Sequence, residues 1–221
     1  MAGMRVNRQL QARGGAKIGS GSANYTDFDT SSGCQTMAGT AKIYKELWIP
    51  ASEFDVVAAG SANMTSGSTY LAVAGAHFHT RTLTQTQASA AAITEWCGIA
   101  PLDACTTGSV IPYLEVMPTT AIAAGSDLAK PTVRYSYVNV GSGSTSSGSV
   151  ALATATCINP GTLAFRQTLT MPNIPSFTGG QLMKFQVDFP AVSASNTCAS
   201  QLGLVGLRLR YIVDKLGAPN G

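Results

Sequence analysis

Polar and apolar residues alternate along several stretches of the chain with a period of two. In residues 132–138, the side chains of Val133, Tyr135 and Tyr137 fall on one face, with polar residues between them. Residues 183–189 are apolar at the odd positions and polar at the even ones. This alternation is typical of a β-strand that buries one face in a core. Both stretches are therefore expected to be strands of a sheet with one covered face.

Further extended segments occur along the chain. Near the C-terminus, Leu207, Leu209 and Tyr211 share one face, and Arg208 and Arg210 share the other. Segments rich in β-branched and aromatic residues, as strands are, are KIYKELWIP, STYLAVAGAHFHTRTLTQT, SVIPYLEVMP, SVALATATCI and LAFRQTLTMPNI. The stretches between strands, such as GSGSTSSGS and NIPSFTGG, are rich in Gly, Ser, Pro and Asn, as turns are.

About eight strands with polar turns and almost no helix indicate an all-β fold, and the irregular spacing favours a jelly-roll β-sandwich over a meander. At most one short helix is expected, near 86–97, because its alanines favour helix. Residues 1–40 contain many Gly, Ser, Thr and Asn residues and little apolar periodicity, so they cannot bury enough surface to offset chain entropy. We predict an extended N-terminal arm over 1–40 and a jelly-roll β-sandwich domain over 41–221.

The composition is poor in charge. Only 11% of the 221 residues are charged, against about 25% in a typical soluble domain. Such a surface suits a subunit that meets neighbours in an assembly, and equally a Ser- and Thr-rich β-protein that works outside cells. The sequence contains no apolar run long enough to span a membrane, and no apolar stretch follows the early arginines as it would in a secretory signal.

Four cations precede the first acidic residue, Asp27. They are Arg5, Arg8, Arg13 and Lys17, and the net charge of the whole chain is +3. Cations spaced along a Gly-containing coil can neutralise phosphates without reading a base sequence. A solvated tail, or an arm that reaches a neighbouring subunit, explains the same residues, since nucleic-acid arms usually carry denser charge. We treat the four as candidate interface residues.

The five cysteines are Cys34, Cys97, Cys105, Cys157 and Cys198. Their number is odd, so at least one is unpaired or bonds between chains. Cys97 and Cys105 flank a short loop and could form a local disulfide; buried free thiols are the other interpretation. No C-x-x-C pair occurs, so no zinc site is expected.

Candidate chemistry is sparse. His77 and His79 would point to the same side of a strand, as two metal ligands would. They are the chain's two histidines, and no acidic residue lies close to them in the sequence, so a polar strand face is the better interpretation. Six acids could supply a pair for glycoside chemistry, but nothing in the sequence sets their spacing: Glu46, Glu53, Asp55, Glu95, Asp103 and Glu115. We expect no catalytic residues, no cofactor and no metal.

Three short motifs occur in a fixed order. They are WIPA at 48–51, FQV at 185–187 and LVGLRLRY at 204–211. In order and rough spacing, residues 42–215 resemble a family of tailed-phage virion proteins that carry a WIPA-like first strand and related late strands. The resemblance implies a β-sandwich subunit of a virion and brings no catalytic residues.

Two departures from the family pattern matter. DFPA at 188–191 replaces a more polar ending, and a Cys-bearing insertion lies near 86–110. The resemblance does not determine which part of the virion the chain forms.

These observations lead to a functional hypothesis. We expect a non-enzymatic structural subunit of a virus particle, and first a decoration (cement) protein on the capsid surface of a tailed phage. Its partners would be the major capsid protein and copies of itself, as a trimer, with weak nucleic-acid contact through the arm and no membrane. One alternative is a tail-fibre or spike component that binds a host glycan. Another is a small icosahedral coat protein with a genome-binding arm.

The first strand of the domain contains one candidate contact residue, Trp48. Leu47 and Ile49 share one face of this strand, and Glu46 and Trp48 share the other. Because Glu46 is charged, the second face is not expected to be core. Trp48 would then lie at an interface, where an aromatic anchor contributes most to association. Pro50 would end the strand at a sheet edge.

Overall fold

The computed structural model describes residues 43–57, 92–104, 108–118, 128–139, 141, 143, 145–152, 156–157, 166–189 and 202–213. Only the backbone is described at 92, 118, 128–129, 156–157 and 202, and in the strands at 16–19, 25–28, 35–38, 64–73, 76–83 and 215–216. Almost all of this is β-structure. Within the described residues, the single helical element is one 3₁₀ turn, Ala51–Glu53, and no helix there is long and apolar enough to span a membrane.

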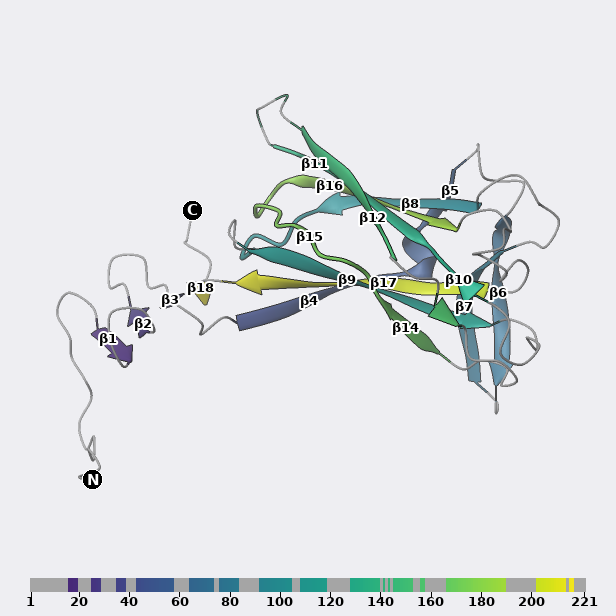
Figure 1. Ribbon diagram of the computed structural model, residues 1–221, viewed down its shortest axis with the longest axis horizontal. Helices are drawn as coiled ribbons and strands as arrows, with labels where there is room; N and C mark the ends of the chain where they lie inside the picture. Colours follow the sequence, from purple (N-terminus) through teal and green to yellow (C-terminus); the bar gives the residue numbers. More distant parts are fainter. Residues whose placement is uncertain are drawn as a thin grey trace, which may run out of the picture.

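Two antiparallel sheets form the body of the protein (Figure 1). The strands of the larger sheet are β4 (Ile43–Pro50), β6 (Met64–Val73), β7 (Ala76–Leu83), β9 (Ser109–Pro118), β14 (Gln167–Thr170), β15 (Ile174–Pro175) and β17 (Leu202–Val213). Their order is β14-β9-β17-β7-β6, with β15 also paired to β9 and β4 to β17. The long strand β17 therefore runs through the middle of the sheet and contacts β9, β7 and β4.

The smaller sheet lies over the first. Its strands are β5 (Asp55–Val56), β8 (Ala92–Ile99), β11 (Thr132–Val138), β12 (Thr145–Ala151) and β16 (Leu182–Phe189), in the order β12-β11-β16-β8-β5. The core lies between the two sheets. Phe177 packs against Tyr137 of the smaller sheet and Tyr211 of the larger one, with ring centroids 5.9 and 5.5 Å apart. The predicted all-β jelly-roll sandwich is confirmed.

In three strands, the core residues are those that the alternation singles out. Val133, Tyr137 and Phe185 are buried from the smaller sheet, and Leu207 and Leu209 from the larger one. Period-two patterning thus identified the buried faces of β11, β16 and β17, because each of these strands has one face in the core and one outside.

The expected helix near 86–97 is wrong where the structure describes it. Residues 92–97 belong to β8, which pairs along its whole length with β16, while 86–91 lie outside the described residues. Thr94 is fully buried, and Trp96 stacks on Phe185 at 6.2 Å. Pairing with β16 and this packing outweigh the weak helix preference of the alanines.

The backbone of the N-terminal region contains three short strands, β1 (Ala16–Gly19), β2 (Tyr25–Phe28) and β3 (Gln35–Ala38). They pair in sequence as antiparallel neighbours, and β18 (Lys215–Leu216) adds to β3. Figure 1 shows this small sheet beside the sandwich. The C-terminal end of the predicted domain thus pairs with the predicted arm, and the boundary at residue 40 stays a prediction.

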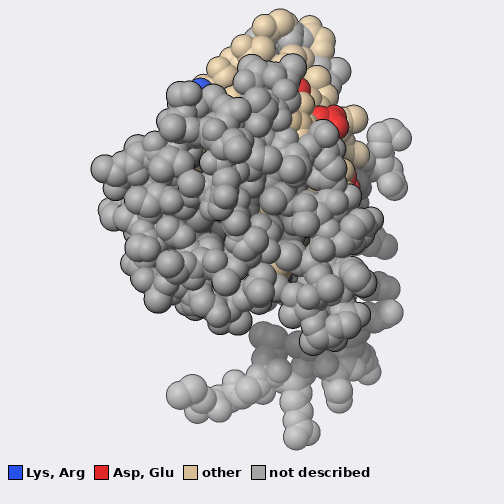
Figure 2. All heavy atoms as spheres, turned by 90° about the vertical axis from the view of Figure 1, so that its right-hand side faces the viewer, with Lys and Arg blue, Asp and Glu red and all other residues tan. Residues whose placement is uncertain are grey.

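A further two-stranded pair, β10 (Leu128–Ala129) with β13 (Thr156–Cys157), completes the described strands. Figure 2 views the molecule from the right-hand side of Figure 1. Most of the described surface seen there is uncharged, with a small group of acidic side chains near one edge, as the low charge content leads one to expect.

Candidate binding site

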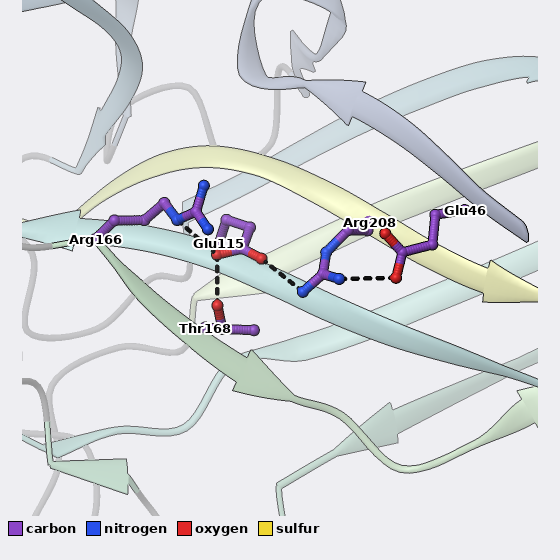
Figure 3. A network of polar contacts seen from close by, with 5 residues as sticks. All are labelled: Glu46, Glu115, Arg166, Thr168 and Arg208. Atoms are coloured by element: carbon purple, nitrogen blue, oxygen red, sulfur yellow. Dashed lines mark hydrogen bonds and ion pairs between the residues drawn. The ribbon is translucent and has the colours of Figure 1, made fainter.

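A network of polar side chains crosses the outer face of the larger sheet (Figure 3). Glu46 comes from β4, Arg208 from β17, Glu115 from β9 and Thr168 from β14, while Arg166 immediately precedes β14. These strands are neighbours in the order β4-β17-β9-β14. Residues far apart in the sequence therefore meet on one surface because of the sheet topology.

Glu115 is the centre of the network. Its neighbours Leu114 and Val116 are buried in the core, so its carboxylate points to the opposite face, yet it is only 1% exposed. The Thr168 hydroxyl donates a hydrogen bond to Oε2 at 2.7 Å, and Arg208 Nη2 donates to Oε1 at 3.1 Å. Arg166 Nε lies 3.4 Å from Oε2. Both carboxylate oxygens are thus satisfied, as a buried charge requires.

Arg208 links two carboxylates. Its Nη1 donates to Glu46 at 2.8 Å while Nη2 donates to Glu115, and the guanidinium lies over the Tyr113 ring, 4.5 Å from its centroid. Burial acts to lower the pKa of Arg208, but hydrogen bonds and charge attraction from Glu115 and Glu46 outweigh it and raise the pKa. The positively charged Arg208 side chain is thus held by two carboxylates and by the Tyr113 ring.

Trp48 forms an exposed wall beside this network. It is 44% exposed, whereas the next residue, Ile49, is 1% exposed and lies in the core. Trp48 pairs with Arg208 in the β4–β17 register. Together with Glu46, Glu115, Arg166 and Arg208 it lines a hollow of about 370 Å³. The site therefore combines one aromatic surface with two acids and two guanidinium groups.

A second aromatic–arginine contact continues along the same two strands. Arg210 lies over the Tyr44 ring, 4.2 Å from its centroid, and Tyr44 is as exposed as Trp48. Tyr44, Glu46 and Trp48 all lie on the outer face of β4, at alternate positions. In the described part of the chain, β4 pairs with β17 alone, so it is an edge strand that ends at Pro50, as predicted.

The structure tests part of the sequence hypotheses about this strand. The prediction that Ile49 faces the core and Trp48 the outer face is confirmed. That Trp48 contacts a partner stays a prediction. Arg5, Arg8 and Arg13 lie outside the described residues, and Lys17 lies in β1, where only the backbone is described. Their role at an interface stays a prediction.

The structure describes the side chains of the six candidate acids but not those of the two histidines. His77 and His79 lie on β7, whose side chains are not described, and the described residues contain no group of three or more metal-ligating side chains. Of the acids, Glu46 and Glu115 meet through Arg208. Others have separate partners: Glu53 with Trp96, Glu95 with Lys184, and Asp103 with Lys45.

Sequence reasoning missed the network itself. Glu115 was only one of six unplaced acids, while Arg166 and Thr168 were not singled out. One local signal existed: Glu115 interrupts the apolar strand SVIPYLEVMP, where an acid on a strand in the middle of a sheet needs a partner. The identity of that partner depends on strand order, which the alternation pattern does not contain.

The outer face of the smaller sheet has its own polar contacts. Arg134 pairs with Asp188, Gln186 donates to Asp188 at 3.0 Å, and Lys184 pairs with Glu95. The exposed Cys97 is a free thiol, and Cys105, with which a local disulfide was considered, lies outside the described residues. A hollow of only about 90 Å³ lies there, and it has no exposed tryptophan, so the larger-sheet site is the better candidate.

Comparisons with known proteins add distant structural similarity. No protein-family model and no curated protein matches the chain. A family 35 carbohydrate-binding module from Clostridium thermocellum matches at 11% identity and a TM-score of 0.37, over 75% of this chain and 97% of that one. The CBM36-1 domain of a multidomain xylanase, from the hindgut metagenome of Trinervitermes trinervoides, matches at 11% identity and a TM-score of 0.35. This match covers 79% of this chain and 98% of that domain. At these values the similarity says nothing about what this chain binds.

Proposed function

We propose that this chain is a non-enzymatic subunit of a virus particle that binds a glycan of the host surface, as a tail-fibre or spike component does. The observation that carries the proposal is the hollow beside Trp48, which has an exposed aromatic wall and charged, hydrogen-bonding side chains around it. We refer to it as the Trp48 pocket, lined by Glu46, Trp48, Glu115, Arg166 and Arg208.

The chemistry of a sugar fits such a pocket. A pyranose ring presents apolar C–H groups on its faces and hydroxyl groups around its edge. An indole provides a rigid flat surface for the C–H faces, with a large contact area and little conformational freedom to lose. Carboxylate groups accept hydrogen bonds from the hydroxyl groups, and guanidinium groups donate hydrogen bonds to them. Both kinds of group lie around one hollow here, and they are held by neighbouring strands rather than by a single loop.

The contacts of the acids support binding rather than hydrolysis. A general acid or nucleophile needs a carboxylate that is free to meet the substrate. Glu115 instead has both oxygens engaged, by Thr168, Arg166 and Arg208. Glu46 accepts from Arg208 as well. These acids are best explained as parts of a rigid binding surface.

Assignment to a virion rests on two sequence features. The WIPA, FQV and LVGLRLRY motifs resemble tailed-phage virion proteins, and the low charge content suits a subunit with extensive contacts. The sandwich with its exposed edge strand β4 is compatible with a place in a tail fibre or spike and with a place on the capsid surface.

A capsid decoration protein is the second candidate function. The observation that favours it is the row of Trp48, Arg208, Tyr44 and Arg210 along β4 and β17, which extends beyond the pocket. Trp, Tyr and Arg are the residues most enriched among the energetic anchors of protein interfaces. In this case the partner would be the major capsid protein.

One experiment compares the two functions. The purified chain and its Trp48→Ala variant are applied to an array of bacterial surface polysaccharides and, separately, to preformed capsids that lack the chain. Glycan binding by the wild type that Trp48→Ala abolishes supports the fibre or spike function. If the chain binds capsids but no glycan, and Trp48→Ala abolishes the capsid binding, the result supports the capsid decoration function instead. Binding that Trp48→Ala leaves unchanged overturns both.

A further inference from the structure

The charges of the Trp48 pocket cancel among themselves. Two carboxylates, Glu46 and Glu115, face two guanidinium groups, Arg166 and Arg208. Arg208 is shared between both acids, and Arg166 lies against Glu115. The four side chains therefore carry no net charge, and each guanidinium already has an anionic partner inside the pocket.

We propose that this pocket selects an uncharged sugar unit over an acidic or phosphorylated one. The inference rests on the proposed glycan-binding function and narrows its ligand class. An anionic ligand would have to compete with Glu115 for the guanidinium groups. Displacing them would leave a carboxylate that is 1% exposed without its cationic partners, which is unfavourable for a buried charge.

Neutral hydroxyl groups avoid this competition because each one both donates and accepts hydrogen bonds. The Glu46 side chain is 46% exposed and the Arg166 side chain 63% exposed, so an acceptor and a donor are accessible at the rim without breaking the network. Trp48 is accessible beside them. A sugar can thus rest one face on the indole while its edge hydroxyls meet Glu46 and Arg166.

The size of the hollow agrees with a short segment of glycan. Its volume of about 370 Å³ lies at the low end of the range for small-molecule pockets, which is roughly 300–1,000 Å³. The nearby Arg210 does not line the pocket but lies over Tyr44, so it adds no unpaired cation to the wall.

The test measures binding of three classes of probe to the full chain: neutral oligosaccharides (a gluco-, a manno- and a galacto-oligosaccharide series), oligosialic acid and a mannose-phosphate oligosaccharide. Each titration is run at low and at high NaCl. We expect binding in the neutral class, lost in Trp48→Ala and changed less than about twofold by salt, because no ion pair between protein and ligand forms.

A charge variant makes the selectivity itself measurable. Glu46→Gln removes one negative charge from the rim of the pocket while keeping the shape of the side chain. It should therefore gain salt-sensitive binding of the acidic probes that the wild type lacks. Melting temperatures of both variants establish that they are folded, as the exposure of Glu46 and Trp48 leads one to expect.

The possible failures are distinguishable. If the wild type binds acidic probes best and loses affinity at least tenfold in high salt, the neutral-sugar inference is wrong while the glycan-binding function stands. The inference is also wrong, and the function again stands, if Glu46→Gln gains no binding of acidic probes. If no probe of any class binds the folded wild-type chain, the proposed function falls with the inference.

Discussion

The indole of Trp48 lies against Gly206, across the ladder between β4 and β17. A side-chain carbon placed on Gly206 would overlap the indole and come within 2.6 Å of the carbonyl oxygen of Ile49. The missing side chain thus leaves the space that the Trp48 indole occupies against β17. The orientation of the aromatic wall therefore depends on a glycine in the neighbouring strand.

Gly206→Ala should displace Trp48 and strain the β4–β17 pairing. We expect the free energy of unfolding to fall by about 1–3 kcal/mol, the usual cost of overpacking, together with a shift in tryptophan fluorescence of the folded state. Urea denaturation followed by fluorescence measures both. Gly143→Ala is the control, since a side-chain carbon there meets no atom within 4 Å. Equal stability of the two variants would contradict the close packing of Trp48 on β17.

Glu115→Gln should destabilise the domain. The variant keeps an acceptor for Thr168 but leaves Arg166 and Arg208 without their shared carboxylate. We expect a loss of about 1–3 kcal/mol in urea denaturation, typical of removing one partner of a buried polar contact.

Glu95→Gln is the matched control for this change. Glu95 pairs with Lys184 on the outer face of the smaller sheet, where both side chains are partly exposed. An exposed pair contributes about 0–1 kcal/mol. If Glu95→Gln costs as much as Glu115→Gln, then Glu115 is not the structural centre of its network.

The stability of the domain should fall at alkaline pH because of Tyr211. Burial, and then the nearby Asp103, raise the pKa of Tyr211 from 10.0 to about 12. Between these two values the unfolded chain releases the phenol proton and the folded chain retains it, so stability decreases as pH rises from 10 to 12. Tyr211→Phe should make this decrease shallower in urea denaturation measured at about pH 9, 10, 11 and 11.5.

Tyr137 provides a comparison for the alkaline effect. Burial, with the nearby Tyr135, raises its pKa as well. Tyr137→Phe should therefore also reduce the slope, and the double variant should reduce it further. A slope that neither variant changes would show that other groups cause the alkaline loss of stability.

Deletion of residues 1–40 should leave the sandwich folded and weaken assembly. The deletion removes β1, β2 and β3, which pair with one another and with the two residues of β18. Among the side chains that the structure describes, every core residue of the two main sheets lies beyond residue 40. Circular dichroism and a melting curve of the truncated chain measure folding. A truncated chain that does not fold would place the arm inside the domain.

Alternation, together with the polar turns and the spacing of the segments, was enough to predict the fold class, and it identified the buried faces of β11, β16 and β17. Val133, Phe185 and Leu207 are buried because each occupies the apolar phase of a strand with one covered face. The same reasoning placed Ile49 inside and Trp48 outside. The helix expected near 86–97 rested on alanine content instead and was wrong at β8, where residues 92–97 contain one alanine and the strand-favouring Ile93, Thr94 and Trp96.

The candidate site could not be predicted in the same way. Glu46, Glu115 and Arg208 are separated by 69 positions or more, and they meet only because β4, β17, β9 and β14 are neighbours. Strand order in a jelly roll depends on long connections that carry no periodic signal. Trp48 could be identified because the alternation of its neighbouring residues predicts which face of the strand it occupies.

The central claim is that the outer face of β4 binds a ligand while its inner face belongs to the core. The most direct test measures melting temperature and ligand binding for Trp48→Ala and Ile49→Ala in parallel. Trp48→Ala should keep a melting temperature close to that of the wild type and weaken binding by more than about 1 kcal/mol. Ile49→Ala, at a residue that is 1% exposed, should lose about 2–5 kcal/mol of stability and, where still folded, keep its affinity. If Trp48→Ala unfolds the domain while Ile49→Ala only weakens binding, the claim is contradicted.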